Sequence, residues 1–200
     1  DANLNRSVES ALFGGMSNAG QTCISTEEVF IERPIYDRFV DKISKRIKTL
    51  KSGKDKSSDL GSMIMPENTS KVNRHIEEAR KSCKIIQGGA EDNTMFIPPT
   101  LVLEPDESLP IVNEETFGPV ISLRSFSNED ELIEKIHKTG YGLSASIFGK
   151  DSTRIHSIIK SIKTGNVSIN DVLTHYGIAS IPFGGEGLSG AGRMHGKEGL

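Results

Sequence analysis

Short apolar segments alternate with amphipathic helical segments along the whole chain, and this alternation limits most strongly how the chain can fold. Apolar runs typical of strands occupy residues 29–31, 84–87, 100–103, 120–126, 144–148 and 166–170. Between most of them, apolar residues recur every three or four positions, as they do along one face of a helix. Strands that alternate with helices favour parallel pairing. The sequence therefore predicts an α/β fold with a largely parallel sheet.

The predicted helices have apolar faces made of residues three or four positions apart. These faces comprise Leu4, Val8, Leu12 and Met16; Ile35, Phe39, Val40, Ile43, Ile47 and Leu50; Val72, Ile76, Ala79 and Cys83; Leu132, Ile133 and Ile136; and Ile155, Ile158, Ile159 and Ile162. Residues 51–68, rich in Ser, Gly, Lys and Asp, are expected to form a surface connection. Residues 93–115 are expected to follow an extended, looping path apart from 100–103.

Helix starts are marked by capping residues. Asp1 or Asn3 is expected to cap the first helix, which should end near Asn18. Ser127 followed by Asp130 predicts a capping box, and Asp151 should open the last helix. Pro34 suits the first turn of the second helix.

Composition excludes several classes of partner. The net charge of −3 comes from 24 basic and 27 acidic residues spread along 200 positions, so a polyanion site such as one for nucleic acid is not expected. No apolar run approaches the ~20 residues that span a bilayer, and no signal-peptide pattern is present. We expect a cytoplasmic protein, with membrane attachment through a further C-terminal tail left open.

Cysteine and histidine spacing favours free thiols over cross-links or metal. Cys23 and Cys83 are far apart in the sequence, and a chain of this size does not need a disulfide. The five histidines show no paired ligand spacing, so no metal site is predicted.

The segment Gly20–Ile24, Gly-Gln-Thr-Cys-Ile, follows the first predicted helix directly. A glycine at such a break lets the backbone turn sharply and present the next side chains, which makes Cys23 a candidate nucleophile. Cysteine is also among the most frequently buried residue types, so this segment alone equally fits a packing role. The spacing of Cys83 on its helix predicts packing for that thiol.

Four motifs in this order favour the role of Cys23 as a nucleophile over a packing role. They are Gly20–Ile24, Glu114–Val120 (Glu-Glu-Thr-Phe-Gly-Pro-Val), Pro182–Gly185 and Ser189–Arg193. Together they resemble the signature set of the aldehyde dehydrogenase superfamily, and Gly20–Ile24 with the ending Arg193–Lys197 resembles in particular its class 3, or fatty-aldehyde, branch. The resemblance implies a three-layer, largely parallel twisted sheet with helices on both faces, and a catalytic domain that spans residues 1–200.

The resemblance also implies roles for single residues. Cys23 would attack the aldehyde carbonyl, with its own N–H helping to hold the oxyanion. Glu115 would accept hydrogen bonds from the nicotinamide ribose of NAD or NADP, and Phe117 would pack beside the nicotinamide ring. Thr22, Ile24 and Phe183 would line the aldehyde pocket, and Asn170 would support the site.

Other parts of the family pattern are expected outside these 200 residues. They are the cofactor-binding domain, the general-base Glu, the oxyanion Asn and the last oligomer-forming strand. Consistent with this, the sequence has no Gly-x-Gly-x-x-Gly that opens a helix after a strand. We therefore expect the isolated chain to bind NAD weakly or not at all, to lack turnover and to self-associate, and the whole enzyme to form a homo-oligomer, a dimer.

Two alternatives stay open at this point. One is a CoA-acylating or acyl-phosphate reductase of the same superfamily, which passes the thioester to an acceptor other than water. The other is a non-catalytic association module whose cysteines are buried. The sequence does not identify the aldehyde.

Overall fold

The computed structural model describes residues 1–199, of which the side chain of Glu198 is left out, and it divides the chain into two compact units. One unit comprises Ala11–Ser127, and the other joins Asp1–Ser10 to the chain from Asn128 onward. The prediction that residues 1–200 make one catalytic domain stays a prediction.

The first helix, α1 (Leu4–Met16), begins where the sequence predicts. The Asn3 Oδ1 atom accepts a hydrogen bond from the Arg6 N–H at 3.1 Å, so Asn3 caps the helix. A 3-10 turn, η1 (Ser17–Gly20), follows, in which Asn18 and Ala19 have φ angles of 52° and 55°. This turn ends the helix sharply ahead of Cys23.

A four-stranded sheet forms the centre of the unit Ala11–Ser127. Its order is β1 (Glu28–Glu32), β6 (Val120–Phe126), β5 (Thr100–Leu103) and β3 (Lys84–Gln87). β1, β6 and β5 run parallel, whereas β3 pairs antiparallel with β5. The predicted α/β fold with a largely parallel sheet is confirmed, with β3 as the one reversed strand of this sheet.

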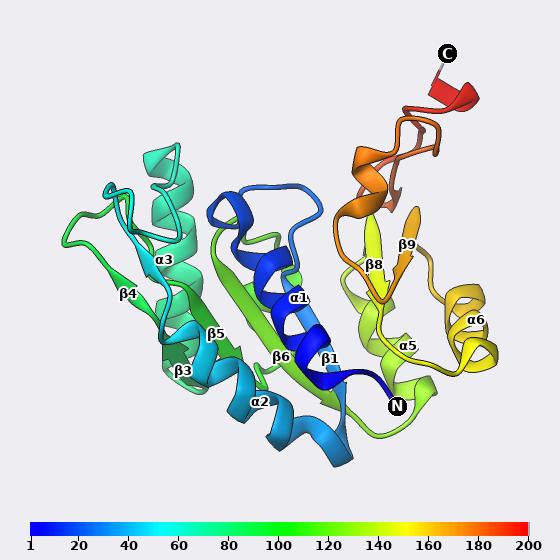
Figure 1. The fold of residues 1–200 in the computed structure, drawn as a ribbon, viewed down its shortest axis with the longest axis horizontal. Helices are drawn as coiled ribbons and strands as arrows, with labels where there is room; N and C mark the ends of the chain where they lie inside the picture. Colours follow the sequence, from blue (N-terminus) through cyan, green and yellow to red (C-terminus); the bar gives the residue numbers. More distant parts are fainter. Residues whose placement is uncertain (200) are drawn as a thin grey trace. The chain divides into compact units, whose positions relative to one another are not determined.

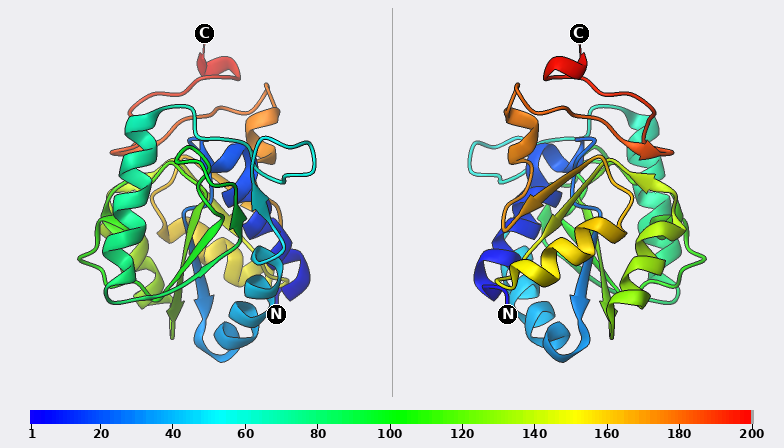
Figure 2. Two further views of the ribbon diagram at one scale, coloured as in Figure 1. Left: turned by 90° about the vertical axis from the view of Figure 1, so that its left-hand side faces the viewer. Right: turned by 90° about the vertical axis from the view of Figure 1, so that its right-hand side faces the viewer.

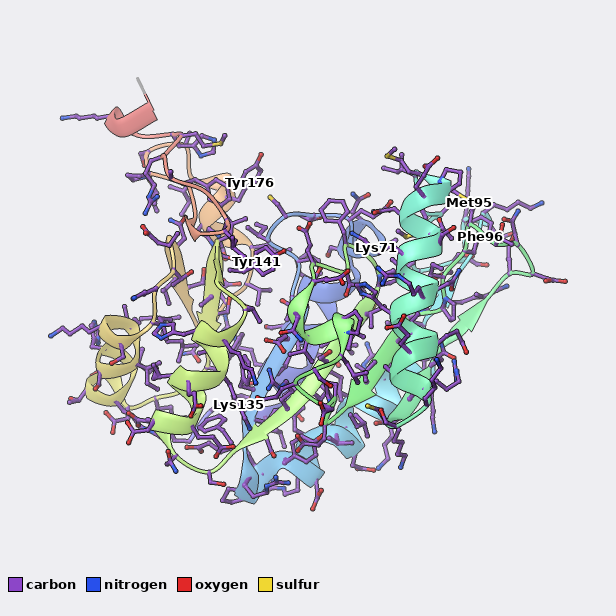
Figure 3. The ribbon with its side chains drawn as sticks, turned by 180° about the vertical axis from the view of Figure 1, so that it is seen from behind. Lys71, Met95, Phe96, Lys135, Tyr141 and Tyr176 are labelled. Carbon is purple, nitrogen blue, oxygen red and sulfur yellow. The ribbon has the colours of Figure 1, made fainter. Side chains whose placement is uncertain are left out.

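Helices cover both faces of this sheet, which gives three layers (Figure 1). α2 (Arg33–Ile47) lies on one face and α3 (Pro66–Arg80) on the other, as the side views of Figure 2 show. Seen from behind in Figure 3, α3 lies in front of the strands. α2 has its proline in the first turn, as predicted, and buries Tyr36, Phe39, Ile43 and Ile47.

Alternate residues of the central strands pack against opposite helices. Val102 and Val120 join a cluster with Val72, Ile76 and Ala79 of α3. Cys83 lies partly buried against this cluster, in agreement with the packing role predicted for it. On the other face, a Cβ added to Gly15 of α1 would lie 2.6 Å from the Ile121 side chain, so this helix and β6 are in close contact.

Two loop regions contain more structure than the sequence predicts. Lys51–Ser52 forms β2, which pairs parallel with β4 (Gly89–Ala90). Pro110–Asn113 forms α4, a single helical turn that begins at its proline. Both pieces are too short for a periodic pattern to show in the sequence.

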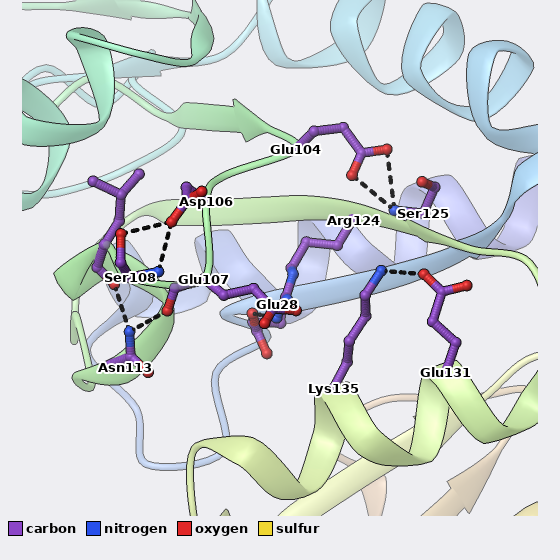
Figure 4. A network of polar contacts seen from close by, with 11 residues as sticks. Glu28, Glu104, Asp106, Glu107, Ser108, Asn113, Arg124, Ser125, Glu131 and Lys135 are labelled. Carbon is purple, nitrogen blue, oxygen red and sulfur yellow. Dashed lines mark hydrogen bonds and ion pairs between the residues drawn. The ribbon is translucent and has the colours of Figure 1, made fainter.

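A buried arginine ties β6 to β1 and to the segment after β5 (Figure 4). Arg124 is 3% exposed, and its guanidinium lies 2.9 Å from a carboxylate oxygen of Glu28 and 2.9 Å from one of Glu107. Its Cζ atom lies 5.3 Å from the centroid of the Phe30 ring. A charge buried this deeply needs both acidic partners.

The second unit contains a parallel strand pair, β8 (Ser144–Ile147) with β9 (Asn166–Ile169). Its helices are α5 (Glu129–Lys138) and α6 (Ser152–Ser161), with 3-10 turns η2 (Thr174–Gly177) and η3 (Lys197–Gly199). A short antiparallel pair joins β7 (Tyr141–Gly142) to β10 (Glu186–Gly187).

The capping of these helices confirms one prediction and corrects another. Asp151 caps α6 by accepting the Arg154 N–H at 3.1 Å, as predicted. The capping box at Ser127 is wrong, because the cap of α5 is Asn128, whose Oδ1 accepts the Glu131 N–H at 2.9 Å. Within residues 1–199, none of the helices is both long and apolar enough to span a bilayer.

Candidate active site

Cys23 lies at the tip of a tight turn, with its side chain exposed. The turn is closed by the Ser25 N–H, which donates to the Thr22 carbonyl oxygen at 2.9 Å. Ser25 Oγ and the Thr26 N–H both donate to the Gly14 carbonyl of α1, at 3.2 Å and 3.1 Å. The thiol is therefore presented to solvent by backbone that is bonded on both sides of it.

The backbone before this turn is held in the left-handed region over three residues. Asn18, Ala19 and Gly20 have φ angles of 52°, 55° and 71°. A Cβ at Gly20 would lie 2.0 Å from the Gly118 carbonyl oxygen, so only glycine fits. This contact brings the nucleophile loop (residues 20–27) directly against the cofactor loop (residues 114–119).

Gln21 fixes the nucleophile loop from within. Its side-chain amide donates to the Asn18 and Ser62 carbonyl oxygens at 3.1 Å and 3.3 Å, and its Oε1 accepts the Ile64 N–H at 2.8 Å. Gln21 is 9% exposed, and these bonds satisfy the buried amide. The residue therefore links the loop of Cys23 to the segment ahead of α3.

Strand pairing explains why the two loops meet. The nucleophile loop runs into β1 and the cofactor loop runs into β6, and these strands are parallel neighbours in which Glu28 pairs with Ser122. The amino ends of neighbouring parallel strands lie at the same edge of a sheet. Cys23, Glu115 and Phe117 are thereby gathered at one edge of one unit.

The backbone of Phe117 is unusual for an aromatic residue, with a φ angle of 55°. Its N–H donates to Glu27 Oε1 at 2.8 Å, and its carbonyl accepts from Asn68 Nδ2 at 3.3 Å. Such a conformation persists only where the surroundings hold it. The ring is half-exposed, and the neighbouring Glu115 side chain is exposed, so both are open to a ligand.

His75 contacts two side chains of the cofactor loop. It is fully buried, with Nδ1 3.1 Å from Thr116 Oγ1 and Nε2 3.3 Å from Glu114 Oε2. Arg74 also pairs with Glu114, at 3.2 Å. Burial is the main cause that lowers the pKa of His75, and the hydrogen bond from His75 is the main cause that lowers the pKa of Glu114.

The predicted pocket residues Thr22 and Ile24 flank Cys23 in the same turn. Thr22 is half-buried, whereas Ile24 is 6% exposed. Their contact with an aldehyde stays a prediction.

The remaining predicted site residues, Asn170 and Phe183, belong to the other unit. The Asn170 Oδ1 atom accepts the Gly149 N–H at 3.0 Å, and its Nδ2 atom donates to the Gly149 carbonyl oxygen at 2.8 Å. Phe183 is buried beside His175 and Tyr176, with ring centroids 5.9 Å and 5.1 Å away. The fold of this unit gives Asn170 a structural task and places Phe183 in an aromatic cluster, and their predicted roles stay predictions.

Sequence reasoning missed Glu27, His75 and Gln21 as parts of the site. His75 carried a usable signal, because it lies on the apolar face of α3 between Val72 and Ile76. Glu27 and Glu28 carried no signal that separates them in the sequence, since both directly precede the apolar run 29–31. Among the described side chains, no three of His, Cys, Asp and Glu gather in a way that would hold a metal ion.

The family model described as "Aldehyde dehydrogenase family" matches residues 1–200, the whole chain. The chain belongs to the aldehyde dehydrogenase family. It is 33% identical to 4,4'-diapolycopene aldehyde oxidase from a Methylomonas species, over 100% of this chain and 38% of that protein. It is 32% identical to glutarate-semialdehyde dehydrogenase from Pseudomonas putida, over 100% of this chain and 42% of that one.

Solved aldehyde dehydrogenases share the fold. Betaine aldehyde dehydrogenase from Staphylococcus aureus, in a structure described as a complex with NAD+, matches with a TM-score of 0.92 and 32% identity. The match covers 100% of this chain and 41% of that one. The chain thus spans about two fifths of the length of these relatives.

Proposed function

We propose that this aldehyde dehydrogenase chain contributes the nucleophile and part of the nicotinamide site of an NAD- or NADP-dependent enzyme that oxidises an aldehyde to a carboxylic acid. The observation that carries the proposal is the exposed thiol of Cys23 on a rigid turn, in backbone contact with the loop of Glu115 and Phe117. An exposed thiol with fixed surroundings argues against an association module with buried cysteines.

In the proposed reaction, the Cys23 thiolate adds to the aldehyde carbon and forms a thiohemiacetal. We assign to the N–H of Cys23 a role in stabilising the oxyanion. Loss of a hydride leaves a thioester on Cys23, and water releases the carboxylic acid. Because the hydride has to leave from a carbon bonded to this sulfur, its acceptor must bind beside the turn.

The residues of the cofactor loop fit a nicotinamide riboside group. Glu115 is an exposed carboxylate, and a carboxylate accepts hydrogen bonds from two ribose hydroxyls. The half-exposed ring of Phe117 offers a flat apolar wall for the nicotinamide. When bound, the nicotinamide supplies the hydride acceptor. The NAD+ complex of the betaine aldehyde dehydrogenase supports this assignment by family relationship.

Thioester hydrolysis needs a general base, and the structure argues against the acids nearest Cys23. Both side-chain oxygens of Glu27 accept backbone N–H groups, and Glu28 is paired with Arg124. We propose that the base comes from elsewhere in the enzyme. The relatives' names mention a glutarate semialdehyde and a 4,4'-diapolycopene aldehyde, so we assign the substrate only as an aldehyde.

Alkylation of the thiols tests the role of Cys23. We expect iodoacetamide to modify Cys23 at least about tenfold faster than Cys83, and an added aliphatic aldehyde to slow that reaction by reversible addition to the thiol. The measurement is mass spectrometry of the labelled peptides, with Cys23→Ser and Cys83→Ser as matched controls and the corresponding alcohol in place of the aldehyde. Equal rates for the two thiols, or no effect of the aldehyde, would overturn the proposal.

A further inference from the structure

Glu27 connects the two loops of the candidate active site through both its main chain and its side chain. Its carbonyl oxygen accepts the Ser122 N–H of β6 at 2.8 Å. Its side-chain oxygens accept two successive backbone N–H groups, that of Thr116 at 2.9 Å and that of Phe117 at 2.8 Å. The donors follow Glu115 directly, and Glu27 itself follows Cys23 by four positions.

From this geometry we propose that Glu27 is a positioning residue, which sets the direction of Glu115 and Phe117 relative to Cys23. The inference rests on the proposed function, because it gives that function's nicotinamide site its anchor. Two converging N–H groups form a concave anion-binding site, and one carboxylate fills it. A glutamine at this position has a single acceptor oxygen, and an aspartate is one methylene shorter.

The strained conformation of Phe117 shows why an anchor is needed. With a φ angle of 55°, this residue would relax to a negative φ if its N–H were free. Such a change rotates the peptide that joins Phe117 to Thr116, and Glu115 lies just beyond it. The bond from Asn68 to the Phe117 carbonyl, at 3.3 Å, holds the other side of the residue.

The charges around Glu27 also affect where Glu115 points. Burial raises the pKa of Glu27, and the nearby Glu115 acts in the same direction. The two N–H bonds lower the pKa, and so does Lys71 of α3, which is labelled in Figure 3. Because ionised Glu27 repels a second carboxylate, the side chain of Glu115 is favoured to point away from the anchor. Glu115 is exposed, as a group that meets a ligand hydroxyl must be.

The test compares Glu27→Gln with Glu77→Gln, the same change at an exposed position of α3. Glu77 pairs with Arg80 of the same helix at 3.2 Å. We expect Glu27→Gln to speed amide hydrogen exchange at residues 116 and 117 by about tenfold or more, the loss of roughly one charge-assisted hydrogen bond, and Glu77→Gln to leave it unchanged. Unchanged exchange in Glu27→Gln, or equal acceleration in both variants, overturns the inference.

A second measurement needs no substitution and separates positioning from plain stability. In the unmodified chain, protonation of Glu27 at low pH should weaken the protection of these two amides, relative to their intrinsic exchange rates, by more than it weakens the protection of the amides of β5. Protection there that stays constant down to pH about 4 contradicts the inference.

Binding of nicotinamide riboside at millimolar concentration, followed by ligand-observed NMR, tests the link to function. We expect Glu27→Gln to weaken binding as Glu115→Gln does, and Glu77→Gln to leave it unchanged. Full binding by Glu27→Gln despite a loosened loop overturns the positioning role. Absence of binding by the unmodified chain contradicts the proposed cofactor role of Glu115 instead, and exchange at residues 116 and 117 then decides whether Glu27 anchors the loop.

Discussion

At the scale of single residues, the candidate site depends on side chains that hold its two loops in place rather than on side chains that react. Gln21, Glu27 and His75 each satisfy polar groups of the nucleophile loop or the cofactor loop. A left-handed conformation such as that of Phe117 costs about 1–3 kcal/mol, and the surrounding bonds have to supply that energy. The proposed nucleophile, Cys23, needs only exposure and a fixed turn.

The buried His75 predicts a dependence of stability on pH. Burial lowers its pKa, Arg74 and Lys71 act in the same direction, and Glu114 opposes them. Below pH 6.5, its ordinary value, the unfolded chain binds a proton that folded His75 resists, so the free energy of unfolding falls as the pH drops toward the lowered pKa. The slope is at most about 1.4 kcal/mol per pH unit.

Urea unfolding between pH 5 and 7.5 measures this effect. We expect His75→Gln to have a shallower slope than the unmodified chain, and His156→Gln, at an exposed position on α6, to keep the original slope. Some slope should remain in His75→Gln, because burial also lowers the pKa of His175. An unchanged slope in His75→Gln would show that its protonation is not coupled to folding.

At the scale of elements, helix caps give the sharpest comparison of sequence with structure. Asn128→Ala should lower the free energy of unfolding by about 1 kcal/mol, because the Glu131 N–H loses its acceptor. Asn128→Ser keeps a short acceptor and should cost less. Thermal unfolding of both variants checks this, and equal midpoints for the two would contradict the cap.

The sequence was sufficient to locate most helices and strands, but not to predict how all of the strands pair or which side chains meet across the fold. Periodicity locates β1, β6 and β9 within one or two residues, because strands and amphipathic helices repeat differently. It misses the reversed direction of β3, since an apolar run reads the same whichever way its strand pairs. It also misses which of Glu27 and Glu28 turns toward the cofactor loop, because that depends on a residue almost ninety positions away.

At the scale of the whole molecule, several apolar side chains are more exposed than an isolated folded chain usually leaves them. Ile64 and Met65 are 73% and 56% exposed beside the segment that Gln21 holds, and Phe13 is 63% exposed. Exposed apolar patches favour association. The chain spans about two fifths of the length of the relatives it matches.

We therefore expect the 200-residue chain to self-associate as its concentration rises. Replacing Ile64 and Met65 by Ser should shift sedimentation toward the monomer, while the same change at an already polar exposed pair, Glu77 and Lys81, should not. A strictly monomeric unmodified chain at high concentration would contradict this prediction. The homo-oligomer expected for the whole enzyme stays a prediction.

The touching main chains of Gly20 and Gly118 have a practical consequence for altering substrate preference. The spacing between the turn of Cys23 and the cofactor loop is fixed by peptide groups, so replacing the half-buried side chain at position 22, a predicted pocket residue, should leave the two loops in contact. A library at that position would therefore vary the surroundings of Cys23 on a constant backbone, whereas Ile24, at 6% exposed, is a core position.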